Sequence, residues 1–133
     1  MQRNRRFEAC CRQTTATGFS YTMIIQFNQI EEQQIQGFKG GNGELDTRNY
    51  VDANNKIMMS CLKPGANIGY HSHDMNSEII MVLSGEGYFK YDDVTERVKA
   101  GDVHYCPKGH SHAFYNDGTE DLAYFAIVAE HHE

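Results

Sequence analysis

Histidine and acidic residues at regular spacing indicate a metal site in the middle of the chain. His71 and His73 alternate within the stretch YHSHDMNSE, and Glu78 follows five residues later. Side chains alternate faces along a β-strand, so the two imidazoles would project from one side about 7 Å apart, within reach of one metal ion. A surface strand can also carry such a pair by chance, because two ligands alone do not make a site.

A second stretch strengthens the metal interpretation. GDVHYCPKGHSHAFYN, residues 101–116, places His112 on another predicted strand after the turn-forming PKG. A ligand from a distant strand is what a metal inside a β-barrel would need. His110 shares the parity of His112, and because a free imidazole has a pKa near neutrality, it is a candidate acid or base at the pocket mouth. The alternative for His110 is a turn residue that faces solvent.

The elements that would position these residues are predicted to be almost entirely β. Short apolar stretches bounded by Gly, Pro, Asn or Asp recur along the chain from Met23 onward. Such punctuation is typical of a β-sandwich or a small barrel. The predicted strands are 23–30, 56–63, 77–85, 87–91, 96–106, 111–116 and 121–129, with a loop over 37–49 and a helical turn or two over 29–36.

Length and charge limit the class of protein. The 133 residues suit one domain, which we place at 23–133 after an N-terminal extension at 1–22. The net charge is −6, and because the extension holds four Arg and one Glu, the other residues carry −9. The net negative charge of residues 23–133 disfavours nucleic acid and membrane surfaces as partners, because phosphate binding needs clustered Lys and Arg. No apolar run has the length of a membrane span.

The cysteines and the extension bear on location. The four cysteines, at positions 10, 11, 61 and 106, have neither the spacing of a disulfide scaffold nor a CxxC zinc pattern. Reduced thiols favour a cytoplasmic protein. The Arg-rich extension lacks the apolar core of a secretory signal. It is either an organellar targeting segment or an accessory segment without chemistry, and we favour the second.

Two sets of spaced residues resemble the two sequence motifs of the cupin family. The first set consists of Gly65, His71, His73, Glu78 and Gly85, and the second of Gly101, Pro107, Gly109, His112 and Asn116. Both sets are complete and in order, and a short segment, 86–100, separates them. The resemblance covers residues 65–116 directly, and the predicted strands on either side fit as flanking strands of the same barrel.

The resemblance implies an all-β double-stranded β-helix, or jelly-roll barrel, with one metal near its open end. The ligands that it implies are His71, His73, Glu78 and His112. Three imidazoles and one carboxylate suit a divalent Mn, Fe, Ni, Co, Zn or Cu ion rather than Ca. An octahedral ion would keep two positions for water or substrate. Strand parity adds four residues expected to line the pocket: Ile80, Val82, Phe114 and Asn116.

The resemblance does not select a reaction. The family includes dioxygenases, decarboxylases, sugar isomerases and proteins that only bind small ligands. We expect a metal-dependent enzyme that acts on a small oxygen-rich metabolite, with a non-catalytic binding or sensing protein as the alternative. Ile79, Met81 and Leu83 are expected to face outward and to need cover. This row predicts a homodimer in which residues 23–30 of one subunit cover the other.

Overall fold

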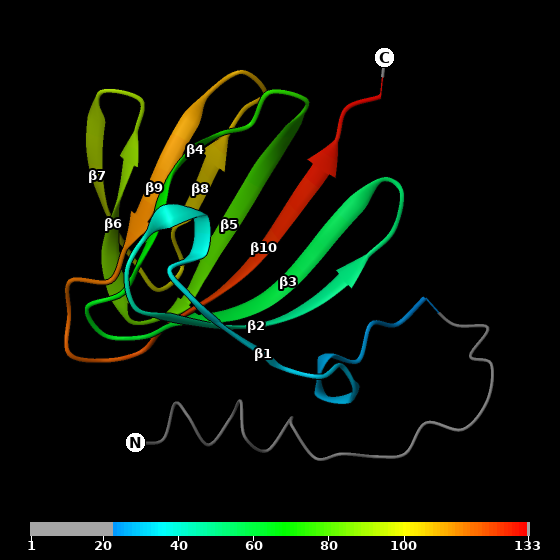
Figure 1. Ribbon diagram of the computed structural model, residues 1–133, viewed down its shortest axis with the longest axis horizontal. Coiled ribbons are helices and arrows are strands. Elements are labelled where there is room, and N and C mark those ends of the chain that lie inside the picture. The colour runs from blue at the N-terminus through cyan, green and yellow to red at the C-terminus, as the bar shows by residue number, and fades with distance from the viewer. Residues whose placement is uncertain (1–22, 133) are drawn as a thin grey trace.

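The computed structural model of the chain describes residues 23–132, so the N-terminal extension lies outside the described residues. As predicted, regular structure in the described part is almost all β (Figure 1). Two short 3₁₀ helices, η1 (Phe27–Gln29) and η2 (Phe38–Gly40), accompany the strands. No helix among these residues has the length and apolar character needed to cross a membrane. The strands are β1 (Gln33–Gln36), β2 (Glu44–Val51), β3 (Asn55–Leu62), β4 (Asn67–Ser72), β5 (Asn76–Ser84), β6 (Glu86–Tyr91), β7 (Val94–Lys99), β8 (Val103–Cys106), β9 (Ser111–Tyr115) and β10 (Leu122–Glu130).

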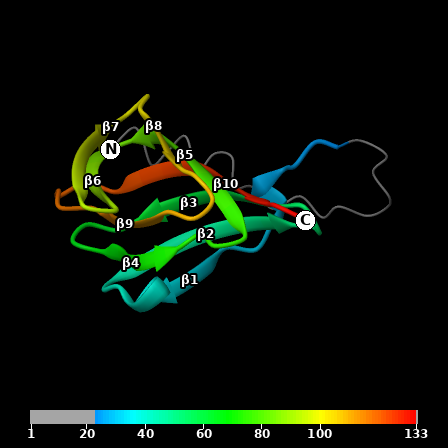
Figure 2. The same ribbon diagram turned by 90° about the horizontal axis from the view of Figure 1, so that it is seen from above.

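The strands form two antiparallel sheets around a shared interior (Figures 1 and 2). The larger sheet has the order β1-β2-β3-β10-β5-β8, and the smaller has the order β4-β9-β6-β7. Between β3 and β6 the chain alternates between the sheets, so that consecutive strands face each other across the interior. This is the double-stranded β-helix implied by the resemblance, with β1 and β2 added at one edge of the larger sheet.

Alternation along β5 separates the inside of the barrel from the outside. Ile80 and Val82 are buried together with Glu78, whereas Ile79 and Met81 are exposed on the outer face. The division follows strand parity, because successive side chains point to opposite faces of a sheet. The prediction that an apolar row of β5 faces outward is therefore confirmed for Ile79 and Met81.

Aromatic stacking links the core to the polar site. Phe89 and Phe114 are both buried and stack with their ring centroids 3.9 Å apart. Phe89 also stacks on an imidazole, because its ring centroid lies 3.8 Å from that of His104. The core therefore contacts the histidine cluster directly and limits its movement.

Two predicted elements at the start of the described residues are wrong. The sequence predicts a strand over 23–30 and a helical turn over 29–36, but η1 is a 3₁₀ turn and β1 is a strand. Phe27 packs edge-on against Phe125 with centroids 6.4 Å apart. Nη1 of Arg48 donates to the carbonyl oxygens of Phe27 and Ile30. This segment therefore packs on the sheet of its own chain, and its role in covering a partner subunit stays a prediction.

The predicted loop over 37–49 is wrong in its second half, which belongs to β2. Three inward positions of this strand are Leu45, Thr47 and Asn49, all of which line a cavity. The Thr47 hydroxyl lies 2.7 Å from that of Ser60 on β3. Because two of the three inward side chains are polar, the strand lacks the apolar alternation by which strands are recognised.

A close backbone contact fixes the glycine-rich loop before β2 to β4 (Figure 1). A Cβ on Gly41 would lie 2.1 Å from the carbonyl oxygen of Asn67, and one on Gly69 would lie 2.1 Å from that of Lys39. Both positions therefore require glycine. The Asn67 N–H donates to the carbonyl oxygen of Asn42 at 2.8 Å, and the Asn42 N–H donates to Asn67 Oδ1 at 2.9 Å. The loop thus has one fixed position beside the strand that carries the first histidine.

Candidate metal centre

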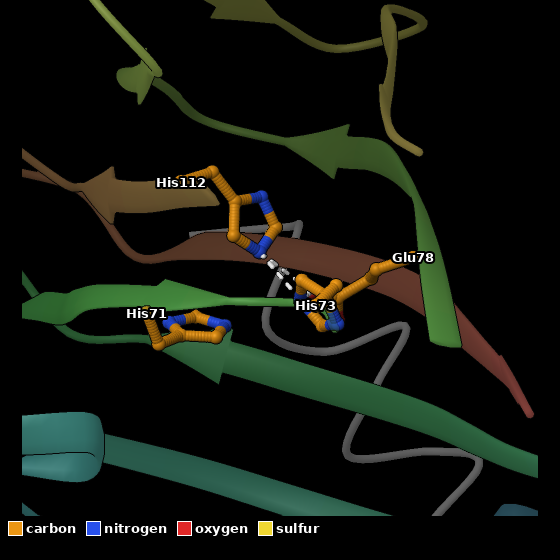
Figure 3. A group of neighbouring side chains, drawn as sticks. All are labelled: His71, His73, Glu78 and His112. Carbon is orange, nitrogen blue, oxygen red and sulfur yellow. Dashed lines mark hydrogen bonds and ion pairs between the residues drawn. The ribbon is translucent and has the colours of Figure 1, made fainter. Parts of the chain in front are cut away.

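Four potential ligands converge inside the barrel (Figure 3). His71 lies on β4, His73 directly after it, Glu78 on β5 and His112 on β9, so both sheets contribute. The strand register places His71 opposite His112. One ligand atom from each of the four residues lies within 4.8 Å of the others. The structure therefore brings together all four residues that the motifs implied as ligands.

The distances between the donor atoms fit a single ion. Nε2 of His73 lies 3.0 Å from Nε2 of His112. Oε1 of Glu78 lies 3.3 Å from the former nitrogen and 3.0 Å from the latter. Ligands at right angles on an ion with bonds of about 2.1 Å are about 3.0 Å apart. The three atoms have the spacing of neighbouring ligands on one transition metal ion.

Hydrogen bonds on the opposite ring nitrogens orient the two histidines of the first motif. Nδ1 of His71 donates to the carbonyl oxygen of Gly69 at 2.7 Å. Nδ1 of His73 donates to Oδ1 of Asn76 at 2.6 Å. Such outer partners select the tautomer in which Nε2 carries a free lone pair, and they hold the ring in place. Both imidazoles are thus held ready to offer Nε2 to a metal.

His104 orients the ring of His112 in the same way, a role that the sequence did not predict. Its Nε2 lies 3.0 Å from Nδ1 of His112 and accepts that N–H in the tautomer that leaves Nε2 of His112 free. The side chain is buried and stacks on Phe89. The available signal was the alternation of VHYC, in which His104 and the buried Cys106 share the inward parity.

Burial and hydrogen bonds favour the metal-binding charge states of Glu78 and His71 but not that of His73. Burial alone would raise the pKa of Glu78, but hydrogen bonds with His112 and His73 outweigh it and lower that pKa to about 2. Burial lowers the pKa of His71 to about 4. Burial would also lower the pKa of His73, but its bonds to Glu78 and Asn76 raise it. At neutral pH the site offers an ionised carboxylate and a neutral His71.

A cavity of about 260 Å³ leads to the ligands. His71, His73 and Glu78 form part of its wall, whereas His112 is buried outside the wall. The remaining wall comes mainly from η2, β2, β3 and the end of β10. A small molecule in this cavity would contact three of the four ligand residues directly.

The cavity wall does not include the four residues expected there from strand parity: Ile80, Val82, Phe114 and Asn116. All four are buried in the core. The Asn116 amide donates to the carbonyl oxygens of Leu62 at 2.9 Å and Glu120 at 2.8 Å, so it fixes a turn. Parity assigns these residues to the inner face, but packed side chains fill most of that face. An inward direction alone therefore does not place a residue in the cavity wall.

His110 lies in the turn between β8 and β9, outside the cavity wall. Its Nδ1 is 2.6 Å from Oδ2 of Asp92 and 3.1 Å from Oη of Tyr91. Its ring stacks on that of Tyr91 with centroids 5.4 Å apart. This placement favours the role of a turn residue over that of an acid or base at the pocket.

Replacing His104 with Phe should weaken metal binding about 10- to 100-fold, the usual effect of losing an outer partner of a ligand. Phe keeps the ring stack on Phe89 but removes the acceptor that orients His112. Calorimetric titration of the metal-free protein with Mn²⁺ and Zn²⁺ measures the change. His110→Phe is the matched control and should bind like the parent. A folded His104→Phe variant with parental affinity would rule out the positioning role.

The metal-free protein should lose stability as the pH falls below 6.5. Burial lowers the folded-state pKa of His71 and of His104 from 6.5 to about 4. Between these values the unfolded chain binds more protons, so protonation favours unfolding. The low pKa of Glu78 extends the loss below pH 4.5, while the raised pKa of His73 opposes it.

Melting temperatures in EDTA-containing buffers, from about pH 7 down to pH 4, test this expectation. His104→Phe should show a shallower decline than the parent, because one of the two histidines with a lowered pKa is gone. A parental melting temperature that stays constant over the whole range would contradict the expected titration.

Comparison with known proteins relates the chain to one family by sequence. The family profile described as "Cupin domain" matches residues 58–128. The oxalate-binding protein of Thermotoga maritima is 31% identical over 112 residues, which cover 80% of this chain and 93% of that relative.

Two solved structures share the architecture. The crystal structure described as a predicted oxalate decarboxylase from Thermotoga maritima has a TM-score of 0.76 and 29% identity, covering 81% of this chain and 99% of that chain. An RmlC-like cupin from Shewanella frigidimarina has a TM-score of 0.66 and 19% identity, covering 89% of this chain and 95% of that one. At 19% identity the likeness shows the fold alone.

Proposed function

The chain belongs to the cupin family, and from this premise we propose that it is a metal-dependent enzyme for a small oxygen-rich acid. His71, His73, Glu78 and His112 hold one divalent transition metal ion, which is Mn, Fe, Ni, Co, Zn or Cu. The observation that carries the proposal is the spacing of 3.0 to 3.3 Å among three donor atoms that converge at a cavity.

The side chains around the site support this role. A bound divalent ion supplies Lewis acidity toward an oxygen placed against it. The protein orients two imidazoles through Gly69 and Asn76 and keeps Glu78 ionised, so the donor set is ordered before an ion arrives. A relative named an oxalate-binding protein and a neighbour described as a predicted oxalate decarboxylase support a small carboxylate as the ligand. Oxalate is therefore the first ligand to test.

The alternative is a non-catalytic protein that binds or senses a small carboxylate or sugar. The name of the oxalate-binding relative favours this alternative. We favour an enzyme because the cavity reaches three of the four ligands, so a captured molecule would lie within reach of the ion's Lewis acidity. Turnover separates the two functions, since a binder returns its ligand unchanged.

The test combines metal analysis with ligand recovery. The untagged protein, purified without added metal, is analysed for bound elements, then titrated with oxalate and incubated with it. About one equivalent of a transition metal, saturable oxalate binding and new carbon products by mass spectrometry would support the enzyme. Oxalate that binds and is recovered intact would support the binding protein. A protein that takes up no metal even after reconstitution would contradict the enzyme and leave the binding protein.

We further propose that a second copy of the chain covers the outer face of the larger sheet. Ile79, Met81, Val103 and Tyr105 are 44%, 38%, 58% and 54% exposed and pair across β5 and β8. This uncharged patch can pack against its own copy about a twofold axis. Light scattering should give twice the 15.2 kDa of one chain. A monomer at micromolar concentration would contradict the dimer, and a dimer that forms only without residues 1–22 would identify that segment as the cover instead.

We also propose that residues 23–133 fold as one domain without the extension, and that the protein is cytoplasmic. The free thiols of Cys61 and Cys106 support a reducing compartment. A chain that begins at Met23 should melt at the temperature of the parent. Failure of that chain to fold would contradict the proposed domain boundary.

A further inference from the structure

Two lysines share the cavity wall with the metal ligands. Lys39, in η2, and Lys56, on β3, line the cavity together with His73 and Glu78. Their ammonium nitrogens lie 5.6 Å and 5.8 Å from the ring centroid of Phe38. An aromatic ring attracts cations, so Phe38 holds both ammonium groups in one neighbourhood. The cavity therefore has a cationic part beside its metal ligands.

The two ammonium groups of this cationic part have no directly paired carboxylate within the described residues. Among residues 23–132, neither Lys39 nor Lys56 forms an ion pair. Burial lowers the pKa of Lys56, repulsion from Lys39 lowers it further, and attraction to Glu78 opposes both effects. Two ammonium groups that repel each other, one on an exposed and one on a half-buried lysine, favour an anion near both.

Two other carboxylates in the cavity wall are already engaged. Oδ1 of Asp52 accepts hydrogen bonds from the N–H groups of Asn54 and Asn55, both at 2.8 Å. Oε1 of Glu130 accepts one from the side chain of Asn76 at 3.3 Å. These interactions leave the two lysines available for an anion that enters the cavity.

Lys39 has a backbone conformation that residues with a side chain rarely adopt. Its φ of 56° and ψ of 31° lie in the left-handed region, which costs a non-glycine residue roughly 1–2 kcal/mol. The contact between the glycine-rich loop and β4, through Gly41 and Gly69, keeps this conformation in place. Backbone strain of this kind is concentrated at ligand-binding sites. The loop thus fixes the point from which the Lys39 side chain extends into the wall.

We propose that Lys39 and Lys56 bind a carboxylate of the substrate that is separate from the group held by the metal. The inference rests on the proposed function, because it assumes a metal at His71, His73, Glu78 and His112. It narrows the substrate to small hydroxy or oxo acids that carry a second carboxylate. The cavity of about 260 Å³ suits such a metabolite, since it is smaller than the sites of drug-sized ligands.

The experiment compares two probes that differ by one carboxylate. L-malate and L-lactate share a 2-hydroxycarboxylate group for the metal, and malate adds a second carboxylate. Calorimetry on the Mn²⁺-loaded full chain should give malate at least a tenfold advantage over lactate, about the gain from one charge-assisted hydrogen bond. The double variant Lys39→Met with Lys56→Met should lose that advantage and keep the parental affinity for lactate. Methionine retains an apolar stem against Phe38, so the loop contacts are preserved.

Controls separate the lysine role from the metal site. Lys90→Met is matched, because Lys90 lies 5.4 Å from the ring centroid of Tyr115 but outside the cavity wall, and it should keep the malate advantage. Manganese content must be equal in all three proteins. Equal manganese with an unchanged malate advantage in the double variant would overturn the lysine proposal alone. A parental chain that binds neither manganese nor any other of the six proposed metals would instead contradict the proposed metal function on which the inference rests.

Discussion

Replacing Glu78 with Gln is expected to weaken binding of the transition metal by more than about 100-fold, a larger effect than the loss of an outer partner. Glu78 supplies the only carboxylate of the four ligands, and its Oε1 lies 3.0 Å and 3.3 Å from two ligand nitrogens. Gln preserves the size of the side chain but removes the negative charge that offsets the charge of the ion. Competition with a chelating dye measures the affinity, and elemental analysis measures the stoichiometry.

The matched control for this change is Glu130→Gln. Glu130 also lines the cavity but lies outside the ligand cluster, so its variant should keep about one equivalent of metal. The two variants remove the same charge, which excludes a general electrostatic effect. A folded Glu78→Gln protein with parental metal content would show that the carboxylate is not a ligand.

Replacing Gly69 with Ala is expected to cost about 3 kcal/mol of unfolding free energy, at the upper end of the usual range for overpacking. The added Cβ would lie 2.1 Å from the carbonyl oxygen of Lys39 and 2.8 Å from the backbone nitrogen of Gly41. Both contacts are with backbone, so no side-chain rotation can relieve them. Either the loop or β4 must move, and Nδ1 of His71 then loses its fixed acceptor. Chemical denaturation measures the loss of stability.

The variant Gly118→Ala is the control for the glycine change. A Cβ at Gly118 would be 3.4 Å from Oδ1 of Asn116, an ordinary contact, so its effect should be within about 0.5 kcal/mol. Gly69→Ala should also weaken metal binding, because the displaced strand carries His71. Parental stability and metal affinity in Gly69→Ala would mean that the loop contact does not hold the site together.

Residue type and local spacing predict His71 and His73 as a pair of candidate metal ligands, whereas the full set with Glu78 and His112 was implied by the resemblance to the two cupin motifs. His71 and His73 lie two apart on one chain segment, and their common direction follows from strand parity alone. The inward and outward sides of β5 follow from the same rule. These features need no knowledge of which strands become neighbours.

The partners of these residues depend on strand order and were therefore not predictable in the same way. His104 meets His112 because β8 and β9 lie in different sheets that face each other, which the spacing of eight residues does not reveal. Similarly, the cavity wall comes from β2 and η2, whose polar and glycine-rich sequences were interpreted as a loop. Tertiary packing, rather than local preference, decides the conformation there.

The position of β10 has a consequence for how the protein is made. This last strand lies between β3 and β5 and pairs with both along most of its length. During synthesis the ribosome releases β3 and β5 before residues 122–130. Each of these two strands therefore keeps one unpaired edge until β10 has been made. Unpaired edges are templates for association with other chains. The larger sheet therefore cannot be completed before residues 122–130 are synthesised, and a ribosome that stalls before Leu122 would leave a nascent chain prone to aggregate.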